Sequence, residues 1–256
     1  MKSPIQLKTK KSNASPTLKQ LIPPKSVVNS FLFFSGENEF ELVKNNVFVI
    51  AHTTSYAVYE FWRCAQTDPA RISEAVEFFN RMVQEEKMFY HTQEKWMEYK
   101  DPFVRSALFY LLSFYSDSGQ VSSGAFEDRG SQALHLGLTR LKTFKIDNFH
   151  LKFDEGDDFL DGATQITKGD YLLIPCGEYS YNYFEEGVNL GFEETRVYHK
   201  KIKKFFDTTR SRCILTYWKH SRLFELYGDH NIIMIDKFGR KTDDREKCVE
   251  VIIANF

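Results

Sequence analysis

Cysteine is scarce in this sequence, with four residues in a chain of 256. Cys64, Cys176, Cys213 and Cys248 lie far apart, and no pair has the two-residue spacing that is common among structural zinc ligands. The scatter argues against a structural zinc site. Reduced thiols in a cytoplasmic setting are the simplest interpretation.

Long apolar runs and a strong net charge are also missing. No stretch approaches the ~20 apolar residues of a transmembrane helix, and the basic start "MKSPIQLKTKKSNASP" lacks the apolar segment of a secretory signal. The net charge is -1 and the isoelectric point about 6.7, so the overall balance does not indicate a nucleic-acid-binding protein. A local basic patch is still compatible with a neutral total. We therefore expect a cytoplasmic protein.

Aromatic residues, by contrast, are abundant. The chain has 24 Phe and 13 Tyr, and aromatics make up 16% of it. A sizeable core is therefore available, and the length suits one large domain or one domain with an insertion.

Apolar runs of strand length alternate with helical segments at both ends of the chain. Residues 27–34 ("VVNSFLFF") and 45–54 ("NNVFVIAHTT") enclose a short helix or loop, which predicts a βαβ unit with parallel strands. In the second half a helix is expected over 192–210. Further strands are expected at 145–153, 169–175 and 211–218, and the runs "HNIIMIDKF" and "KCVEVIIANF" can form an antiparallel pair. The fold class is therefore α/β.

Three consecutive helical patterns interrupt this alternation, at 55–66, 68–96 and 101–116. Ser55 and Asp68 are placed to cap two of them. The interruption predicts an inserted helical subdomain. We divide the chain into an N-terminal arm (1–26), an α/β domain (27–66 and 133–256) and the helical insertion (67–132).

The first two strands of the predicted sheet end in loops that lack the residues expected of a phosphate or ribose site. In "FFSGENEF" a phosphate or adenosyl site would need two or three glycines, but only Gly36 is present and two glutamates would repel a phosphate. In "AHTTS" a ribose site would need an acid at the strand end, where His52 and Thr53 stand instead. An ordinary turn and an ordinary strand end with a helix cap are the favoured interpretations.

A third strand-end loop, "IPCGEY", follows the strand predicted at 169–175. Cys176 could be a nucleophile, but no His or Asp lies near it in sequence, and a lone Cys beside a buried strand is more often a small packed residue. Tyr179, Tyr181 and Tyr183 could stack a base or cover the mouth of the core, and both possibilities stay open.

A basic run, "HKKIKKFF", lies on a predicted helix. Its lysines are Lys200, Lys201, Lys203 and Lys204. Such a run is usually a solvated face, and contact with a phosphate backbone is the minority interpretation.

The order of these segments resembles the Dam-type DNA N6-adenine methyltransferases over most of the chain. The likeness lies in the register of many segments: "FLFFSGENEF" at the family's F-x-G-x-G loop, "VFVIAHTT" at the strand that ends in Asn-Asp, "GDYLLIPCGEY" at the D-P-P-Y loop, and the closing "EVIIANF". The resemblance implies a Rossmann-like class I methyltransferase fold whose insertion corresponds to a target-recognition region.

The resemblance also implies which residues have lost a function. Phe34, Gly36 and Thr53 stand at the family's S-adenosylmethionine contacts, where the second small residue and the ribose-binding acid are gone.

At the catalytic loop Ile174 replaces the Asp that accepts from the adenine amine, and Pro175 remains. Cys176 replaces the second Pro, and Gly177 the Tyr that stacks on the flipped base. Ile174 cannot accept a hydrogen bond through its side chain, so the family's chemistry has no acceptor there.

The resulting hypothesis is a catalytically inactive methyltransferase-like protein, kept for protein assembly or DNA binding. No cofactor is expected, and no metal. Because the family is common in bacteria and their viruses, a viral accessory or virion-associated protein would fit, located in the host cytoplasm or the virion.

Two alternatives stay open. One is an active S-adenosylmethionine-dependent adenine methyltransferase that uses Glu178, with Tyr179, as a surrogate. The other is a DNA-binding module that uses the helical subdomain and the four lysines. We expect Phe33, Phe34 and Tyr179 to fill any pocket between Gly36, Thr53 and Pro175.

Overall fold

The structure, a computed structural model, describes residues 3–5, 12–156, 158–166, 170–179 and 197–256. Within these residues seven strands form one sheet, in the order β3-β2-β1-β4-β5-β7-β6. The strands are β1 (Val27–Ser30), β2 (Phe48–Thr53), β3 (Phe149–Phe153), β4 (Tyr171–Gly177), β5 (Arg212–Trp218), β6 (Asn231–Asp236) and β7 (Cys248–Ala254). All neighbouring strands are parallel except β7, which runs antiparallel to both β5 and β6.

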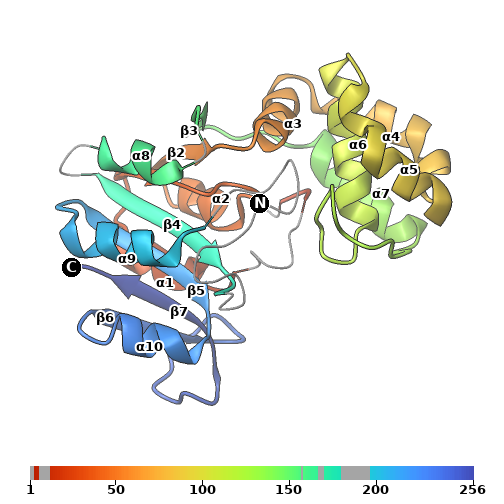
Figure 1. The fold of residues 1–256 in the computed structure, drawn as a ribbon. Helices are drawn as coiled ribbons and strands as arrows, with labels where there is room; N and C mark the ends of the chain where they lie inside the picture. Colours follow the sequence, from red (N-terminus) through yellow and green to blue (C-terminus); the bar gives the residue numbers. More distant parts are fainter. Residues whose placement is uncertain (1–2, 6–11, 157, 167–169, 180–196) are drawn as a thin grey trace.

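Helices cover both faces of the sheet (Figure 1). Alternate residues of β4 belong to different cores, with Leu173 in one and Leu172 and Ile174 in the other. The first core includes α1 (Ser15–Leu21), α2 (Glu37–Lys44) and α3 (Tyr56–Thr67); the second includes α8 (Phe159–Thr164), α9 (His199–Thr208) and α10 (Ser221–Leu226). The predicted α/β class is therefore confirmed, as a mostly parallel sheet between two helical layers.

A separate group of helices lies beyond α3, which stands between this group and the sheet (Figure 1). It contains α4 (Pro69–Val83), α5 (Glu86–Lys95), the short 3-10 helix η2 (Trp96–Glu98), α6 (Pro102–Tyr115) and α7 (Ser131–Lys142). The capping predictions for Ser55 and Asp68 are confirmed, because their side chains accept from the backbone N–H groups of Val58 and Arg71.

Two boundaries of this helical group differ from the prediction. The pattern over 68–96 is two helices, because the chain is extended at Glu85 before α5 begins. The helical group also continues past residue 132, since α7 packs against α4 and buries Leu134, Leu138 and Leu141. These leucines follow the spacing of one helix face, so they need the helices as a partner rather than the sheet.

Two strands also end at residues other than the predicted ones. The strand predicted over 27–34 stops at Ser30, because Leu32 has a φ of 56°, which interrupts extended pairing. The strand predicted over 169–175 continues to Gly177, with an irregularity between Pro175 and Gly177.

The reason for the longer β4 lies in the direction of its backbone groups. The carbonyl of Leu173 accepts from Phe31 N–H, so Leu173 faces β1, and Pro175 faces the same side two residues later. The pairing of β1 with β4 ends at Leu173, so no residue of β1 is paired with Pro175. Proline has no backbone N–H, but at this position its absence costs no hydrogen bond between strands.

Candidate functional site

The sheet has a topological switch point between β1 and β4, the place where open α/β sheets bind ligands at the carboxyl ends of their strands. A cavity of only about 10 Å³ lies there. It is lined by Leu32, Phe34, Ser35, Gly36, Glu37, Asn38, Glu39 and Pro175. This volume is at the lower limit for a single water molecule, whereas ligand pockets usually hold roughly 300–1,000 Å³.

Gly36 is required by the fold itself. It has a φ of 73°, in the left-handed region, and precedes the first residue of α2. A Cβ at this position would lie 2.4 Å from the ring of Phe40. The open side of the glycine is therefore covered by a side chain of the protein's own core.

Phe34 and Thr53 are also engaged inside the protein. The Phe34 carbonyl accepts a hydrogen bond of 2.6 Å from Trp62 Nε1, and its ring packs on Phe109. Thr53 is buried, and its hydroxyl accepts from the N–H of Ser55. Thr53 does not line the small cavity. Of the three predicted cofactor contacts, Phe34 and Gly36 thus share the small cavity and Thr53 lies apart from it.

The residues predicted to fill the pocket also separate. Phe34 lines the cavity as expected, but Phe33 packs away from it against Phe40 and Trp62. The ring of Tyr179 lies 4.4 Å from that of His199. Tyr179 therefore belongs to the layer of α9. The other two tyrosines of that prediction, Tyr181 and Tyr183, lie outside the described residues.

In the loop that includes the end of β4, the side chains of Ile174 and Cys176 are buried. Ile174 is fully buried between β4 and the α8–α10 layer. The buried Cys176 thiol donates to the Ile174 carbonyl at 3.5 Å. Glu178 is exposed and does not line the cavity.

A buried polar chain, which the sequence analysis missed, crosses the ends of β1, β2 and β3. His52 Nδ1 lies 2.9 Å from an Asp154 carboxylate oxygen, and His52 Nε2 lies 3.1 Å from Asn29 Oδ1. The Phe31 ring stacks on the imidazole at 4.3 Å. Because both ring nitrogens already have partners, neither is left to act as a base on a substrate.

A second missed group is Glu39, which is buried on α2 beside the cavity and accepts from the Ser30 hydroxyl at 2.6 Å. The third is Glu250, a buried carboxyl on β7. Its oxygens accept from the Ser12 hydroxyl at 2.5 Å and from the Asn13 N–H at 2.6 Å, so it ties the N-terminal segment to the sheet.

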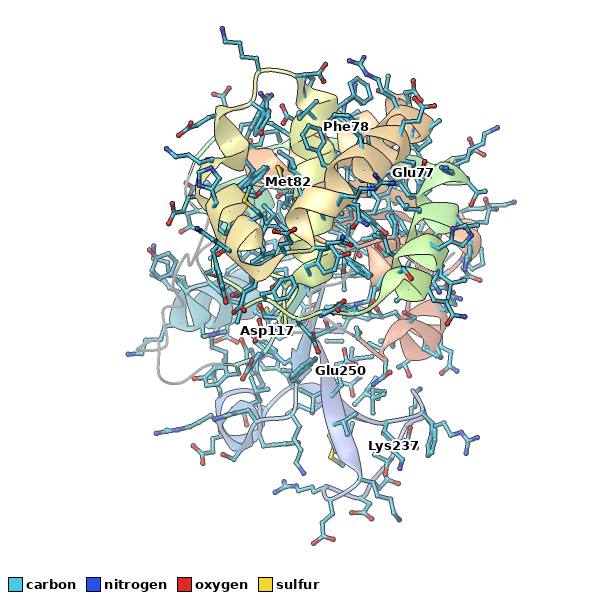
Figure 2. The ribbon with its side chains drawn as sticks, turned by 90° about the vertical axis from the view of Figure 1, so that its right-hand side faces the viewer. Glu77, Phe78, Met82, Asp117, Lys237 and Glu250 are labelled. Atoms are coloured by element: carbon cyan, nitrogen blue, oxygen red, sulfur yellow. The ribbon has the colours of Figure 1, made fainter. Side chains whose placement is uncertain are left out.

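Burial raises the pKa of Glu250 to about 7, against the opposing effect of the two donors. A sequence signal for Glu250 existed, because a glutamate inside the apolar run "VEVIIA" is unusual in a buried strand. Figure 2 shows Glu250 below the helical group.

The basic helix α9 is largely neutralised. Lys201 pairs with Asp158 at 3.2 Å, and Lys203 pairs with Asp207 at 2.5 Å. Lys200 and Lys204 are exposed. The four lysines therefore lie on one helix, as predicted, but two of their charges are already balanced.

At the switch point the cavity found among the described residues is about 10 Å³, a Cβ on Gly36 would meet the Phe40 ring, and the Thr53 hydroxyl accepts from the Ser55 N–H. No cluster of three or more His, Cys, Asp or Glu side chains suited to a metal ion occurs among the described residues. Across the same residues, no helix has the length and apolar character needed to cross a membrane.

No protein-family model matches this sequence, and comparison with curated proteins finds no significant match.

Proposed function

We propose that this chain is a catalytically inactive relative of the Dam-type DNA adenine methyltransferases, kept for binding rather than for methyl transfer. The sheet order supports the first half of this proposal. The usual doubly wound order is 3-2-1-4-5-6, and here a reversed strand, β7, is inserted between β5 and β6. This is the arrangement expected of the class I methyltransferase fold that the sequence resemblance implies.

The observation that carries the second half is the filled switch point. A cavity of about 10 Å³ stands where a cofactor and a flipped adenine would have to meet. The atoms that occupy this region come from the protein's own core, including the Phe34 and Phe40 rings. A site closed in this way supplies neither cofactor binding nor orientation of the reacting atoms.

The position of the lost acid leads to the same conclusion. Adenine N6 becomes nucleophilic when acceptors draw on its amino hydrogens, and such positioned polar groups account for a few orders of magnitude in rate. Ile174 presents only carbon atoms, and they are fully buried. Its neighbours Cys176 and Gly177 supply neither a carboxylate nor an aromatic ring.

Protein assembly is the binding role that the surface supports best. Phe78 is 76% exposed on α4, beside Phe79, and Figure 2 shows it on the face of the helical group. Aromatic residues are enriched at protein interfaces, so Phe78 is the candidate contact with another protein. DNA is the second candidate, supported by Lys200 and Lys204.

The test is an incubation of the purified protein with labelled S-adenosylmethionine and mixed-sequence DNA, with calorimetry for cofactor binding alongside. We expect no label on adenine and no heat of cofactor binding. The competing function, an active methyltransferase with a surrogate acid, predicts adenine methylation that disappears in Glu178→Ala. That result would overturn the proposal.

A further inference from the structure

A second, larger cavity lies in the helical group, away from the switch point. Its volume is about 230 Å³. It lies between α6 and α7 and is also bounded by the N-terminal segment. The lining residues are Pro4, Ile5, Tyr110, Ser113, Phe114, Arg129, Ala133, Leu136, Gly137 and Arg140.

The wall of this cavity contains a buried hydroxyl that no group among the described residues satisfies. Tyr110 is 1% exposed, and its hydroxyl has no hydrogen-bond partner in the described part of the chain. Buried polar atoms without a partner are rare in folded proteins, because the group loses its water and gains nothing in return. The hydroxyl is therefore a donor in need of an acceptor.

Gly137 makes room for that hydroxyl. A Cβ on Gly137 would lie 2.1 Å from the Tyr110 oxygen, a distance that no side chain could tolerate. Both residues line the cavity. The phenol thus reaches the cavity wall only because α7 carries no side chain at this point.

The charge of the cavity is positive. Its lining residues include two arginines, Arg129 and Arg140, and no aspartate or glutamate. Arg129 is already paired with Glu127 at 3.0 Å and donates to the Ser116 carbonyl. The guanidinium of Arg140 has no ion-pair or hydrogen-bond partner in the described part of the chain.

Arg140 also acts on the tyrosine. Burial raises the pKa of the Tyr110 hydroxyl, and the positive charge of Arg140 opposes this effect. The hydroxyl therefore stays protonated at neutral pH and remains a donor. A protonated phenol and an unpaired guanidinium within reach of one cavity form a donor pair for an oxyanion.

The remaining walls are apolar, with Ile5, Phe114 and Leu136 among them. The volume is below the roughly 300–1,000 Å³ of pockets that hold drug-sized ligands or cofactors. A nucleotide is therefore too large, while a bare inorganic ion would leave the apolar walls without a partner.

We propose that this cavity binds a small organic anion, a carboxylate or phosphate monoester on a compact apolar body. One anionic oxygen accepts from the Tyr110 hydroxyl, the charge lies against Arg140, and the body packs on Phe114 and Leu136.

Calorimetric titration of the full chain tests this with three probes of similar shape: benzoate, phenyl phosphate and the neutral benzyl alcohol. We expect at least one anion to bind and the alcohol to bind at least tenfold more weakly. A preference between benzoate and phenyl phosphate identifies which oxyanion the site takes.

Two variants locate the binding. Tyr110→Phe removes the unpartnered hydroxyl, so we expect the unliganded protein to melt at the same or a higher temperature while the anion binds at least tenfold more weakly. Arg140→Gln should weaken binding as well. Arg81→Gln, an exposed arginine on α4 outside the cavity, is the matched control and should leave the affinity unchanged.

A loss of affinity without any loss of stability in Tyr110→Phe is the specific signature of the proposal. It is overturned if neither anion binds, if benzyl alcohol binds as tightly as the anions, or if Tyr110→Phe binds the anion as the natural protein does. It is also overturned if inorganic phosphate binds as tightly as phenyl phosphate, because the apolar walls would then contribute nothing. None of these results depends on whether the protein transfers methyl groups.

Discussion

The sequence resemblance aligns Ile174 with an acid, and the side chains around Ile174 in the structure are apolar. Ile174 packs in the same core as Leu172 and Leu215 and is fully buried. Restoring the acid alone would place a carboxyl group among apolar side chains, where its charged form is strongly disfavoured.

We therefore predict that Ile174→Asp destabilises the protein by about 3 kcal/mol or more and restores no methyl transfer. Urea unfolding and the labelled-methyl assay measure the two effects. Ile174→Val is the control and should cost about 0.5–1.5 kcal/mol. An Ile174→Asp protein as stable as the natural one would show that the position is open to water.

Glu250 gives a second prediction, about pH. Its pKa is raised to about 7 in the folded protein, first by burial. Between the unfolded pKa near 4.5 and about 7, the folded state holds a proton that the unfolded state has released. The contribution of Glu250 to the free energy of unfolding therefore falls as pH rises through this range, by up to about 1.4 kcal/mol per pH unit.

Urea unfolding at several pH values, compared with Glu250→Gln, measures this contribution. The free energy of unfolding should change with pH differently in the natural protein and in the variant, and this difference should be confined to about pH 4.5 to 7. Glu246→Gln, at an exposed glutamate just before β7, should keep the natural slope. Identical slopes for all three proteins would mean that Glu250 is not buried against Ser12 and Asn13.

At the residue scale, local sequence patterns predicted the helix caps but not the partners across the fold. Ser55 and Asp68 cap helices that begin within a residue of them, so the information is local. The Asn29–His52–Asp154 chain joins three strands separated by up to 125 positions. It depends on the register of the sheet, which no single segment contains.

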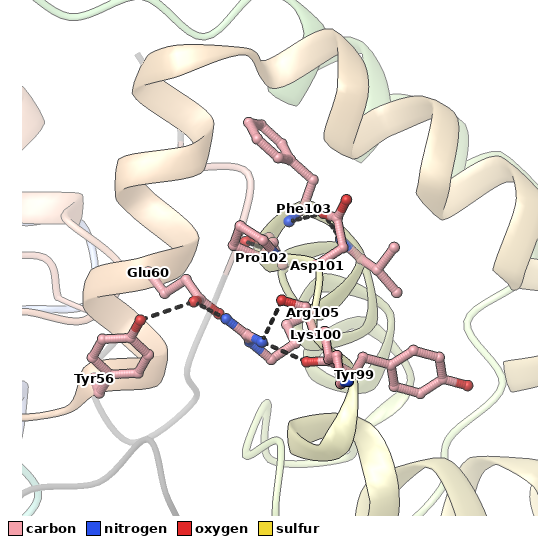
Figure 3. A network of polar contacts seen from close by, with 10 residues as sticks. Tyr56, Glu60, Tyr99, Lys100, Asp101, Pro102, Phe103 and Arg105 are labelled. Atoms are coloured by element: carbon pink, nitrogen blue, oxygen red, sulfur yellow. Dashed lines mark hydrogen bonds and ion pairs between the residues drawn. The ribbon is translucent and has the colours of Figure 1, made fainter.

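Among the elements, a largely buried ion pair joins α3, beside the sheet, to α6 of the helical group. Arg105 on α6 donates to both carboxylate oxygens of Glu60 on α3, with Nε 2.6 Å from one of them (Figure 3). Tyr56 donates to the same carboxylate, and Arg105 also donates to the carbonyls of Tyr99 and Lys100. Glu60 and Arg105 side chains are 7% and 15% exposed, so the pair is largely shielded from water.

We predict that Arg105→Met destabilises the protein by about 3–5 kcal/mol, because it leaves the Glu60 carboxylate buried without its partner. The double variant Glu60→Met with Arg105→Met should cost clearly less, since it removes both charges. Chemical unfolding of the single and double variants measures the difference. Lys142→Met, which breaks an exposed pair with Glu77, should change little. A double variant as unstable as Arg105→Met would argue that packing, not charge, links the helices.

The elements themselves were predictable where the pattern was strong. The antiparallel pairing of β6 and β7 and the βαβ unit around α2 are confirmed. The short helices α8 and α10 were missed, because six residues are too few to display a helical period. The extension of β4 past Pro175 was missed because it depends on where β1 stops, a property of the neighbouring strand.

For the whole molecule, the charge balance decides how DNA could bind. The net charge is -1, so no general attraction to DNA exists and any affinity must come from a local patch. Lys200 and Lys204 are exposed on α9, and Lys201 and Lys203 form ion pairs with Asp158 and Asp207. A site with two phosphate contacts gives a logarithmic salt dependence with a slope of about -1.8.

We therefore predict weak DNA binding in a gel shift at low salt and little binding at physiological salt. The logarithm of the affinity should fall with the logarithm of the salt concentration, with a slope of about -1.8. Changing both Lys200 and Lys204 to Ala should bring the slope close to zero. The matched control changes Lys237 and Lys241 to Ala, two exposed lysines on the β6–β7 hairpin, and should keep the slope. A slope several times steeper would require a larger basic surface than α9 offers. No shift at low salt would remove DNA from the candidate partners and leave protein assembly, through the face around Phe78, as the role of this fold.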